Sequence, residues 1–231
     1  MREIVLDTET TGLDPAKGDR VVEIGAVEIG NLIPTGRTFH VYIDPERDMP
    51  EEAFRVHGLS REFLAGHKKF AEIVDAFREF VEGARLIIHN AEFDVRFLNA
   101  ELSRLDLPPI EQVNVVDTLA LARRRHPGAS NSLDALCQRY GVDTSRREKH
   151  GALLDSYLLA EVYAELMGGR QTVMSLSVER KVAAQSNAQL LRQRPAPLAS
   201  RLTEREDEAH RAFAAGLGKA PIWKRYLSEE P

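Results

Sequence analysis

Residues 4–12 read Ile-Val-Leu-Asp-Thr-Glu-Thr-Thr-Gly, an apolar strand that ends in two acids. Asp7 and Glu9 are two positions apart, so on an extended chain both side chains point to the same face of a sheet. Two like charges at the end of a buried strand destabilise each other unless a cation lies between them. Arg2 is the only basic residue within five positions of this pair. The stretch therefore predicts a divalent metal site, with two solvated acids at a strand end as the alternative.

The composition is that of a globular chain in a reducing compartment. At 231 residues, with 43% hydrophobic and 29% charged residues, the chain is long enough for one buried domain and an additional segment. A single cysteine, Cys137, excludes an internal disulfide framework. No apolar run has the length that a bilayer span requires. We therefore expect a cytoplasmic protein that does not enter a membrane.

Charge divides the chain into two parts. Residues 1–168 contain 20 Lys and Arg against 29 Asp and Glu, a net charge of −9, whereas residues 169–231 contain 11 against 7, a net charge of +4. An acidic body is typical of a metal-binding catalytic domain. It disfavours tight, non-specific binding of nucleic acid, because such binding requires basic surface. If the substrate is nucleic acid, another part of the assembly must deliver it.

Hydrophobic patterns predict an α/β fold built on one mixed five-stranded sheet. Three strands in an antiparallel meander precede two strand–helix units, so we expect helices on both faces and the first strand near the centre. The predicted strands are 2–7, 20–29, 38–43, 85–89 and 113–117. The predicted helices are 51–56, 70–81, 91–105, 118–125, 133–140 and 153–167.

The segment after Gly168 differs in composition from the body. Residues 169–200 contain few large apolar residues and several Gln, Ser and Arg, which predicts a flexible linker. Residues 202–206 form a capping-box pattern that opens a helix through about residue 215. We therefore divide the chain into a domain at 1–168, a linker at 169–200 and a tail at 201–231.

Three further residues complete a cluster with the first two acids. Asp94 falls in the first turn of the helix at 91–105, and Asp155 falls on the helix at 153–167. A gap of five residues places two helical side chains about 140° apart, so we place His150 on the loop before that helix. Four carboxylates without a cysteine or histidine cluster favour Mg²⁺ or Mn²⁺. Two such ions and a neutral histidine base are suited to hydrolysis of a phosphodiester.

Three motifs in order give the chain a resemblance to a known family. The chain contains Asp7-Thr8-Glu9-Thr10-Thr11-Gly12, then Val56-His57-Gly58-Leu59, then His89-Asn90-Ala91-Glu92-Phe93-Asp94, followed by His150 and Asp155 five residues apart. This set resembles the DEDDh branch of the DnaQ-like 3′→5′ exonucleases, whose fold is RNase H-like. Within that family it is similar to the proofreading ε subunits of bacterial DNA polymerase III. The resemblance covers residues 2–168.

The resemblance implies a role for each matching residue. It makes Asp7, Glu9, Asp94 and Asp155 the metal ligands and His150 the general base of a two-metal hydrolysis that releases nucleoside 5′-monophosphates from a DNA 3′ end. It places the terminal nucleotide against Thr10, Thr11, Gly12, His57 and Phe93. It also makes Asn90 a candidate for substrate binding, although we expect Asn90 mainly to brace its loop.

The segment after the body resembles known docking sequences. Gln171, Met174 and Leu176 are spaced as in short peptides that bind bacterial sliding clamps. In the ε subunits the tail docks on the catalytic α subunit of the polymerase, which predicts that role for Trp223 and Tyr226 and a location in the nucleoid-associated replisome. An exoribonuclease that trims RNA 3′ ends and a catalytically silent adaptor between clamp and polymerase are the alternatives.

Several other polar residues have structural interpretations. We expect Asp117 to cap the helix that follows it. The run Arg123–His126 is more typical of a solvated helix end than of a DNA contact. Arg146, Arg147 and Lys149 flank the predicted base and are candidates for contacts with phosphate.

Overall fold

The computed structural model describes residues 2–145, 147, 149–168 and 202–216. The chain divides into two compact units, 1–176 and 177–231. The first contains one sheet of five strands in the order β3-β2-β1-β4-β5. The strands are β1 Glu3–Thr10, β2 Val21–Gly30, β3 Ile33–Tyr42, β4 Arg85–Ile88 and β5 Val115–Asp117. The first three pair antiparallel, and β4 and β5 extend the sheet parallel to β1, which confirms the predicted fold class and the central first strand.

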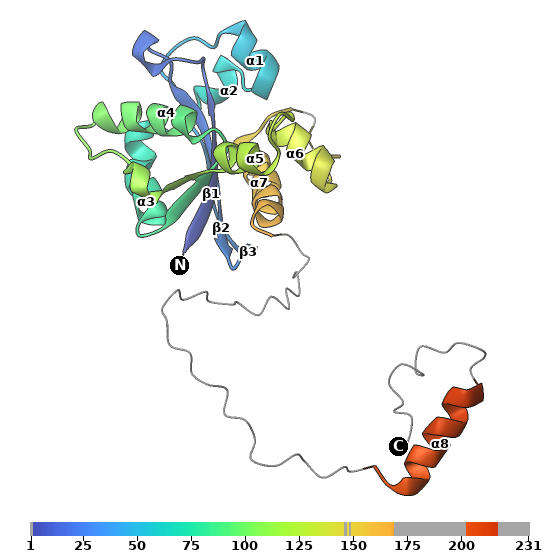
Figure 1. Ribbon diagram of the computed structural model, residues 1–231. Coiled ribbons are helices and arrows are strands. Elements are labelled where there is room, and N and C mark those ends of the chain that lie inside the picture. The colour runs from blue at the N-terminus through green and yellow to red at the C-terminus, as the bar shows by residue number, and fades with distance from the viewer. Residues whose placement is uncertain (1, 146, 148, 169–201, 217–231) are drawn as a thin grey trace, which may run out of the picture. The chain divides into compact units, whose positions relative to one another are not determined.

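Helices cover both faces of the sheet (Figure 1). In the first unit they are α1 Glu51–His57, α2 Arg61–Leu64, α3 Phe70–Val81, α4 Ala91–Ser103, α5 Thr118–Arg125, α6 Leu133–Tyr140 and α7 Ala152–Leu166. Side chains alternate along β1, so Leu6 packs with Phe77 of α3 and Phe97 of α4, whereas Val5 packs with Leu159 of α7. Single 3₁₀ turns lie at Pro15–Lys17 and Gln112–Asn114.

Some strand boundaries differ from the sequence prediction. The first strand was expected to end at Asp7, but β1 continues to Thr10 because β2 pairs with it through Glu9–Glu23 and, after a bulge, Thr10–Val21. The acids therefore lie within the strand, which fixes their direction more firmly than a loop would. The third strand begins five residues earlier than expected, since the tight turn at Asn31 and Leu32 lets β3 pair from Ile33 onward.

The described part of the second unit is one helix. It is α8, Glu204–Gly216, and it opens with the predicted capping box. Glu206 accepts from the backbone N–H of Thr203 at 2.9 Å, and Thr203 Oγ1 accepts from the backbone N–H of Glu206 at 3.4 Å. Among the described residues, no helix is both long enough and apolar enough to cross a bilayer. The proposed clamp peptide at 171–176, Trp223 and Tyr226 lie outside the described residues.

Gly25 sets how closely α7 approaches the sheet. It lies opposite Asp7 in the β1–β2 pairing, and its carbonyl accepts from Ser156 Oγ of α7 at 2.9 Å. A Cβ at this position would lie 2.1 Å from the backbone nitrogen of Leu153 and 2.2 Å from the backbone carbonyl carbon of Ala152. Only glycine therefore allows the start of α7 to rest directly on the strand beside the acids.

We expect Gly25→Ala to lower the free energy of unfolding by about 3 kcal/mol, because the clash is with backbone and α7 must move as a whole. Gly30→Ala is the matched control on the same strand, since its Cβ would meet only Thr35 Cγ2 at 3.5 Å. Urea unfolding followed by circular dichroism measures both variants. Equal stability of the two variants would contradict the close packing of α7.

Candidate active site

β1 presents Asp7 and Glu9 on the face that α7 covers. Asp7 lies opposite Gly25, and Glu9 lies opposite Glu23 of β2. Glu9 is 9% exposed and Glu23 is 3% exposed. The sequence analysis missed Glu23, although an acid within the apolar run Val21–Ile29 signals a buried carboxylate. His40 of β3 lies 2.8 Å from Glu23 through Nε2 and Oε1, so Glu23 has a partner behind the site.

Asp155 reaches the acids from the first turn of α7. It is 3% exposed, and its Oδ1 atom is buried without a hydrogen-bond partner among the described residues. An unpartnered buried carboxylate oxygen is costly, so this atom faces a position that suits a cation. Because Gly25 allows α7 to approach the sheet, this carboxylate comes beside those on β1.

Asp94 is fixed by the strand itself. It lies in the first turn of α4, as predicted, and its Oδ1 accepts from the backbone N–H of Thr8 at 3.1 Å and from Thr8 Oγ1 at 2.7 Å. Thr8 is therefore a positioning residue that the sequence analysis missed. Its alternation with Asp7 and Glu9 places it on the opposite face of β1, where α4 packs.

His150 lies on the loop before α7, as the spacing argument required. Its backbone N–H donates to Val56 O of α1 at 3.4 Å, which ties the loop to that helix. The side chain is exposed, and its Nδ1 atom lies 3.2 Å from Asp155 Oδ2. Ligand atoms of Glu9, His150 and Asp155 all lie within 4.8 Å of one another. The structure thus brings these three predicted residues together, with Asp7 and Asp94 beside them.

Arg147 supplies the positive charge that the sequence near the acids lacks. Its Nη2 atom donates to Asp155 Oδ2 at 2.6 Å and lies 2.8 Å from His150 Nδ1, and its Nη1 atom pairs with Asp134 of α6. The sequence analysis treated Arg147 as a candidate for phosphate contact. Its partners instead include one of the proposed metal ligands. No local pattern signals this, because the contact joins Arg147 to side chains of two different helices, Asp134 of α6 and Asp155 of α7.

Crowding and burial favour the protonated forms of these acids. Desolvation by burial, and then repulsion from Asp94, Glu9, Asp155 and Glu23, raises the pKa of Asp7 well above its usual range. Burial and the adjacent Glu23 raise the pKa of Glu9 to about 8. Burial raises the pKa of Asp94 to about 7 against the opposing hydrogen bonds from Thr8. A divalent cation fits this set of oxygen donors, because it offsets the repulsion that otherwise retains protons.

A cavity of about 580 Å³, the Thr10 cavity, adjoins the acids. Five of the six predicted nucleotide contacts line it: Thr10, Thr11, Gly12, His57 and Phe93. His57 is 6% exposed, its Nδ1 accepts from the backbone N–H of Leu59 at 3.0 Å, and burial lowers its pKa. Its Nε2 atom is buried without a partner among the described residues. Burial therefore favours the neutral form of His57, whose ring lies beside the backbone of Thr10.

Gly12 and Asn90 have different roles. A Cβ on Gly12 would lie 2.3 Å from Asp19 Oδ2, so a larger residue there would displace the Asp19 side chain that braces the loop. Asn90 does not line the Thr10 cavity; it precedes α4 with a positive φ of 63°, and its backbone N–H donates to Asp117 Oδ1 at 3.1 Å. That oxygen also accepts from the backbone N–H of Leu119 at 2.9 Å, the expected cap. The loop of Asn90 is thus braced, and the side chain of Asn90 is exposed.

The raised pKa values predict how pH affects the metal-free chain. Each acid binds protons more tightly when folded than when unfolded, so stability is present at low pH and is lost as pH rises through the folded pKa. For Glu9 and Asp7, stability decreases as pH rises from 7 to 8.5. In this range the histidines whose pKa is lowered by burial are mostly uncharged in both the folded and the unfolded protein. We expect a loss of about 1.4 kcal/mol per pH unit for each carboxyl that stays protonated.

Thermal unfolding with EDTA and with MgCl₂ at pH 7, 7.5, 8 and 8.5 measures this effect. The midpoint in EDTA should fall with pH, and Mg²⁺ should add stabilisation that grows with pH because it binds the ionised carboxylates. Asp7→Asn should flatten the fall in EDTA. A midpoint that is independent of pH in EDTA would contradict the protonated state of the site.

Comparison with known proteins identifies the fold and the family. The family model described as Exonuclease (RNase_T) matches residues 4–163. Exonuclease X in complex with 5′ overhanging duplex DNA superimposes with a TM-score of 0.55 at 24% identity, over 71% of this chain and 90% of that one. The nuclease domain of 3′hExo, a DEDDh family member bound to rAMP, superimposes with a TM-score of 0.63 at 15% identity. The match covers 72% of this chain and 91% of that one. At these identities the structural likeness establishes the fold.

Relatives at higher identity cover between 76% and 96% of the chain. The DNA polymerase III subunit epsilon of Rickettsia felis is 49% identical over 225 residues, 95% of this chain and 98% of the relative. The subunit epsilon of Escherichia coli K12 is 46% identical over 238 residues, which are 96% of this chain and 97% of that relative. The subunit epsilon of Rickettsia conorii is 58% identical over 179 residues, which are 76% of this chain and 78% of that relative. The chain belongs to the exonuclease family and, within it, to the DNA polymerase III epsilon subunits.

Proposed function

We propose that this chain removes mispaired 3′-terminal nucleotides from DNA as the proofreading subunit of a DNA polymerase III. The reaction is a metal-dependent 3′→5′ hydrolysis that releases nucleoside 5′-monophosphates. The observation that carries this proposal is the convergence of Glu9, His150 and Asp155 ligand atoms within 4.8 Å, in a chain of this family. The comparisons with epsilon subunits favour this function over the trimming of RNA ends, and the complete acid cluster favours it over a silent adaptor.

The acids are suited to two divalent cations, Mg²⁺ or Mn²⁺. Asp7, Glu9, Asp94 and Asp155 would hold them, since these carboxylates offer hard oxygen donors from three elements. Bound ions supply Lewis-acid chemistry: they acidify water and neutralise charge on the phosphate. The unpartnered Oδ1 of Asp155 and the raised pKa values of Asp7 and Glu9 support this assignment.

His150 is the proposed general base. It is exposed, so it can meet an attacking water, and it lies on a loop rather than within a helix, so its ring can turn. Its Nδ1 atom lies 2.8 Å from Arg147 Nη2, and an imidazole is the side chain best suited to take a proton near neutral pH. In this role His150 receives the proton of the water that attacks the terminal phosphodiester.

The Thr10 cavity is the proposed site of the terminal nucleotide. Thr10, Thr11 and Gly12 form its edge beside Glu9, and Phe93 offers a ring for contact with base or sugar. A cavity of about 580 Å³ has room for a single nucleotide. We propose that the terminal nucleotide separates from its template to enter, and a mispaired end separates at lower cost. This is the proposed origin of selectivity for mismatched ends.

With Mg²⁺, the full chain should release 3′ nucleotides faster from single-stranded or mismatched DNA ends than from paired ones. Asp7→Ala should lower this rate by roughly 10³-fold or more and leave thermal stability equal or higher, because it relieves repulsion among the acids. Glu92→Ala, at an exposed acid in the first turn of α4, is the control. Equal or faster release from an RNA 3′ end would favour the trimming exoribonuclease. Loss of folding in Asp7→Ala would make Asp7 structural.

The tail is the proposed link to the replisome. We assign Trp223 and Tyr226 to the catalytic α subunit of the polymerase, and Gln171, Met174 and Leu176 to the sliding clamp. The charge difference supports this, since the acidic body binds nucleic acid weakly and residues 169–231 carry a net charge of +4. A tether raises the effective concentration of the exonuclease at the primer end.

Deletion of residues 169–231 should spare hydrolysis of single-stranded DNA and abolish co-purification with the α subunit. Trp223→Ala with Tyr226→Ala in the full chain should reproduce the loss of α binding. Substitution of Gln171, Met174 and Leu176 by alanine should instead weaken binding to the clamp. Retention of α by the truncated chain would refute the assignment of the tail.

A further inference from the structure

A second cavity opens on the edge of the sheet that carries the acids. It has a volume of about 660 Å³, and we call it the Arg123 cavity. Its walls come from residues that follow β4 and β5 and from the start of α6, including His89, Asn90, Arg123, Asn131 and Ser132. β1, β4 and β5 are parallel neighbours, so their carboxyl ends meet at one edge. The Thr10 cavity lies at the β1 side of this edge and the Arg123 cavity at the β4–β5 side.

The first turn of α4 separates the two cavities. Asn90 lines the Arg123 cavity, whereas Phe93, three residues later, lines the Thr10 cavity. Three residues of helix span roughly 5 Å along the axis, which is less than the span of one extended nucleotide. Asp94 lies next in the same turn, within the acid cluster. A strand whose terminal nucleotide fills the Thr10 cavity and whose phosphodiester lies at the acids therefore reaches the Arg123 cavity with its next nucleotides.

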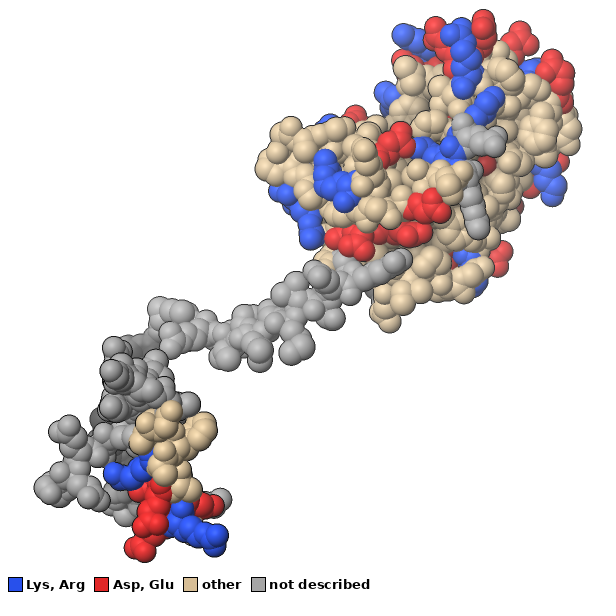
Figure 2. All heavy atoms as spheres, turned by 90° about the vertical axis from the view of Figure 1, so that its right-hand side faces the viewer, with Lys and Arg blue, Asp and Glu red and all other residues tan. Residues whose placement is uncertain are grey.

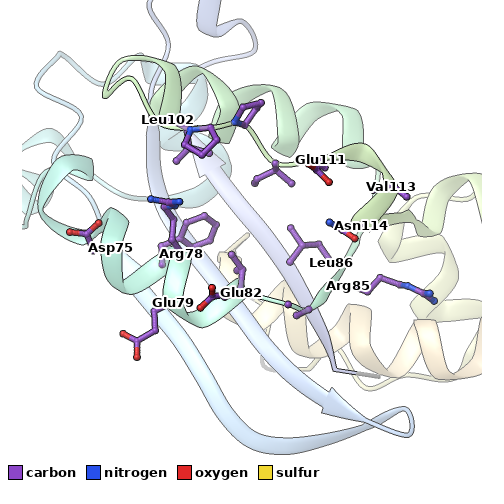
Figure 3. A pocket seen from close by; sticks show the side chains of 17 residues that line it. Asp75, Arg78, Glu79, Glu82, Arg85, Leu86, Leu102, Glu111, Val113 and Asn114 are labelled. Atoms are coloured by element: carbon purple, nitrogen blue, oxygen red, sulfur yellow. The ribbon is translucent and has the colours of Figure 1, made fainter.

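The charge of the Arg123 cavity suits a phosphate backbone. None of its described lining residues is a carboxylate. The Thr10 cavity, by contrast, contains Glu9, Asp14, Asp19 and Glu52, and the cavity in Figure 3 is bordered by Asp75, Glu79, Glu82 and Glu111. Arg123 is exposed and makes no ion pair among the described residues. In a body of net charge −9, this edge is a favourable path for a polyanion.

Asn131 places a buried amide in the wall of this cavity. It is 8% exposed, and its Nδ2 atom donates to His126 O at 3.2 Å and to Ala129 O at 2.9 Å. Its Oδ1 atom is buried and has no partner among the described residues. An amide oxygen in this state needs a donor. The bases of an unpaired strand present N–H donors, which pairing would otherwise occupy.

We propose that the Arg123 cavity binds the unpaired nucleotides immediately upstream of the terminal one, with Arg123 at a phosphodiester and Asn131 at a base N–H. This rests on the proposed function, which places the terminal nucleotide in the Thr10 cavity. It revises the interpretation of Arg123 as part of a solvated helix end. The subsite also adds to the preference for frayed ends, since only unpaired upstream bases leave their N–H donors free.

The test compares two substrates of the full chain with Mg²⁺. One is a single-stranded DNA pentanucleotide, and the other is an aryl ester of thymidine 5′-monophosphate, which has no upstream nucleotide. Arg123→Glu is the variant, and Arg124→Glu is the matched control, because Arg124 is exposed on the same helix and does not line the cavity. Ala129→Glu, which adds an acid to the cavity wall from an exposed position, is a second variant. Thermal unfolding checks that each variant folds.

The readout is kcat/KM for the pentanucleotide divided by kcat/KM for the ester. Arg123→Glu and Ala129→Glu should each lower this ratio by about fivefold or more. Arg124→Glu should change it by less than about twofold. Arg123→Ala should reduce the slope of log KM against log salt for the pentanucleotide by about one. An unchanged ratio in Arg123→Glu, or an equal fall in Arg124→Glu, overturns the subsite. Failure of the unaltered chain to hydrolyse either substrate would instead overturn the proposed function.

Discussion

Repulsion among buried carboxylates at the end of β1 is the constraint on which the structure depends. Asp7 lies close enough to Glu9, Asp94 and Asp155 for each to raise its pKa, and burial adds the largest contribution. Such a cluster is unfavourable for folding, so the surrounding elements must hold it in place. Thr8 fixes Asp94 by two hydrogen bonds, and Arg147 pairs with Asp155. The same repulsion gives the site its affinity for divalent cations, because a cation removes the strain that folding imposes.

The sheet order follows from the need to bring these acids together. β1 contributes two of them, and it must be central for helices on both faces to contribute the others. Its antiparallel partner β2 carries Gly25, which lets α7 deliver Asp155, while parallel β4 leads directly into α4 and Asp94. A side chain at Gly25 would displace α7 and with it one ligand. The alternation of β1, the glycine of β2 and the starts of two helices therefore form one geometric unit.

The sequence predicted what depends on local spacing. Asp7 and Glu9 share a face because they are two apart, Asp94 lies in a first helical turn, and His150 lies on a loop; the structure confirms each of these. It did not predict the length of β1, because that depends on pairing with β2 through Glu9 and Thr10. The contact of Arg147 with Asp155 was not predicted, and neither was the position of Asn90 outside the Thr10 cavity. Both depend on side-chain direction at loops, which tertiary contacts determine.

The distribution of charge connects the site to its substrate. On the face shown in Figure 2, acidic and basic residues of the described part of the chain lie side by side and form no continuous basic surface. A face of this kind offers little binding to the phosphates of a long duplex, since such binding requires many cations along one track. The protein can hold a few unpaired nucleotides where acids are absent, and the edge beside Arg123 meets that condition. Weak binding is then an advantage: paired ends leave quickly, and only a frayed end remains long enough for hydrolysis.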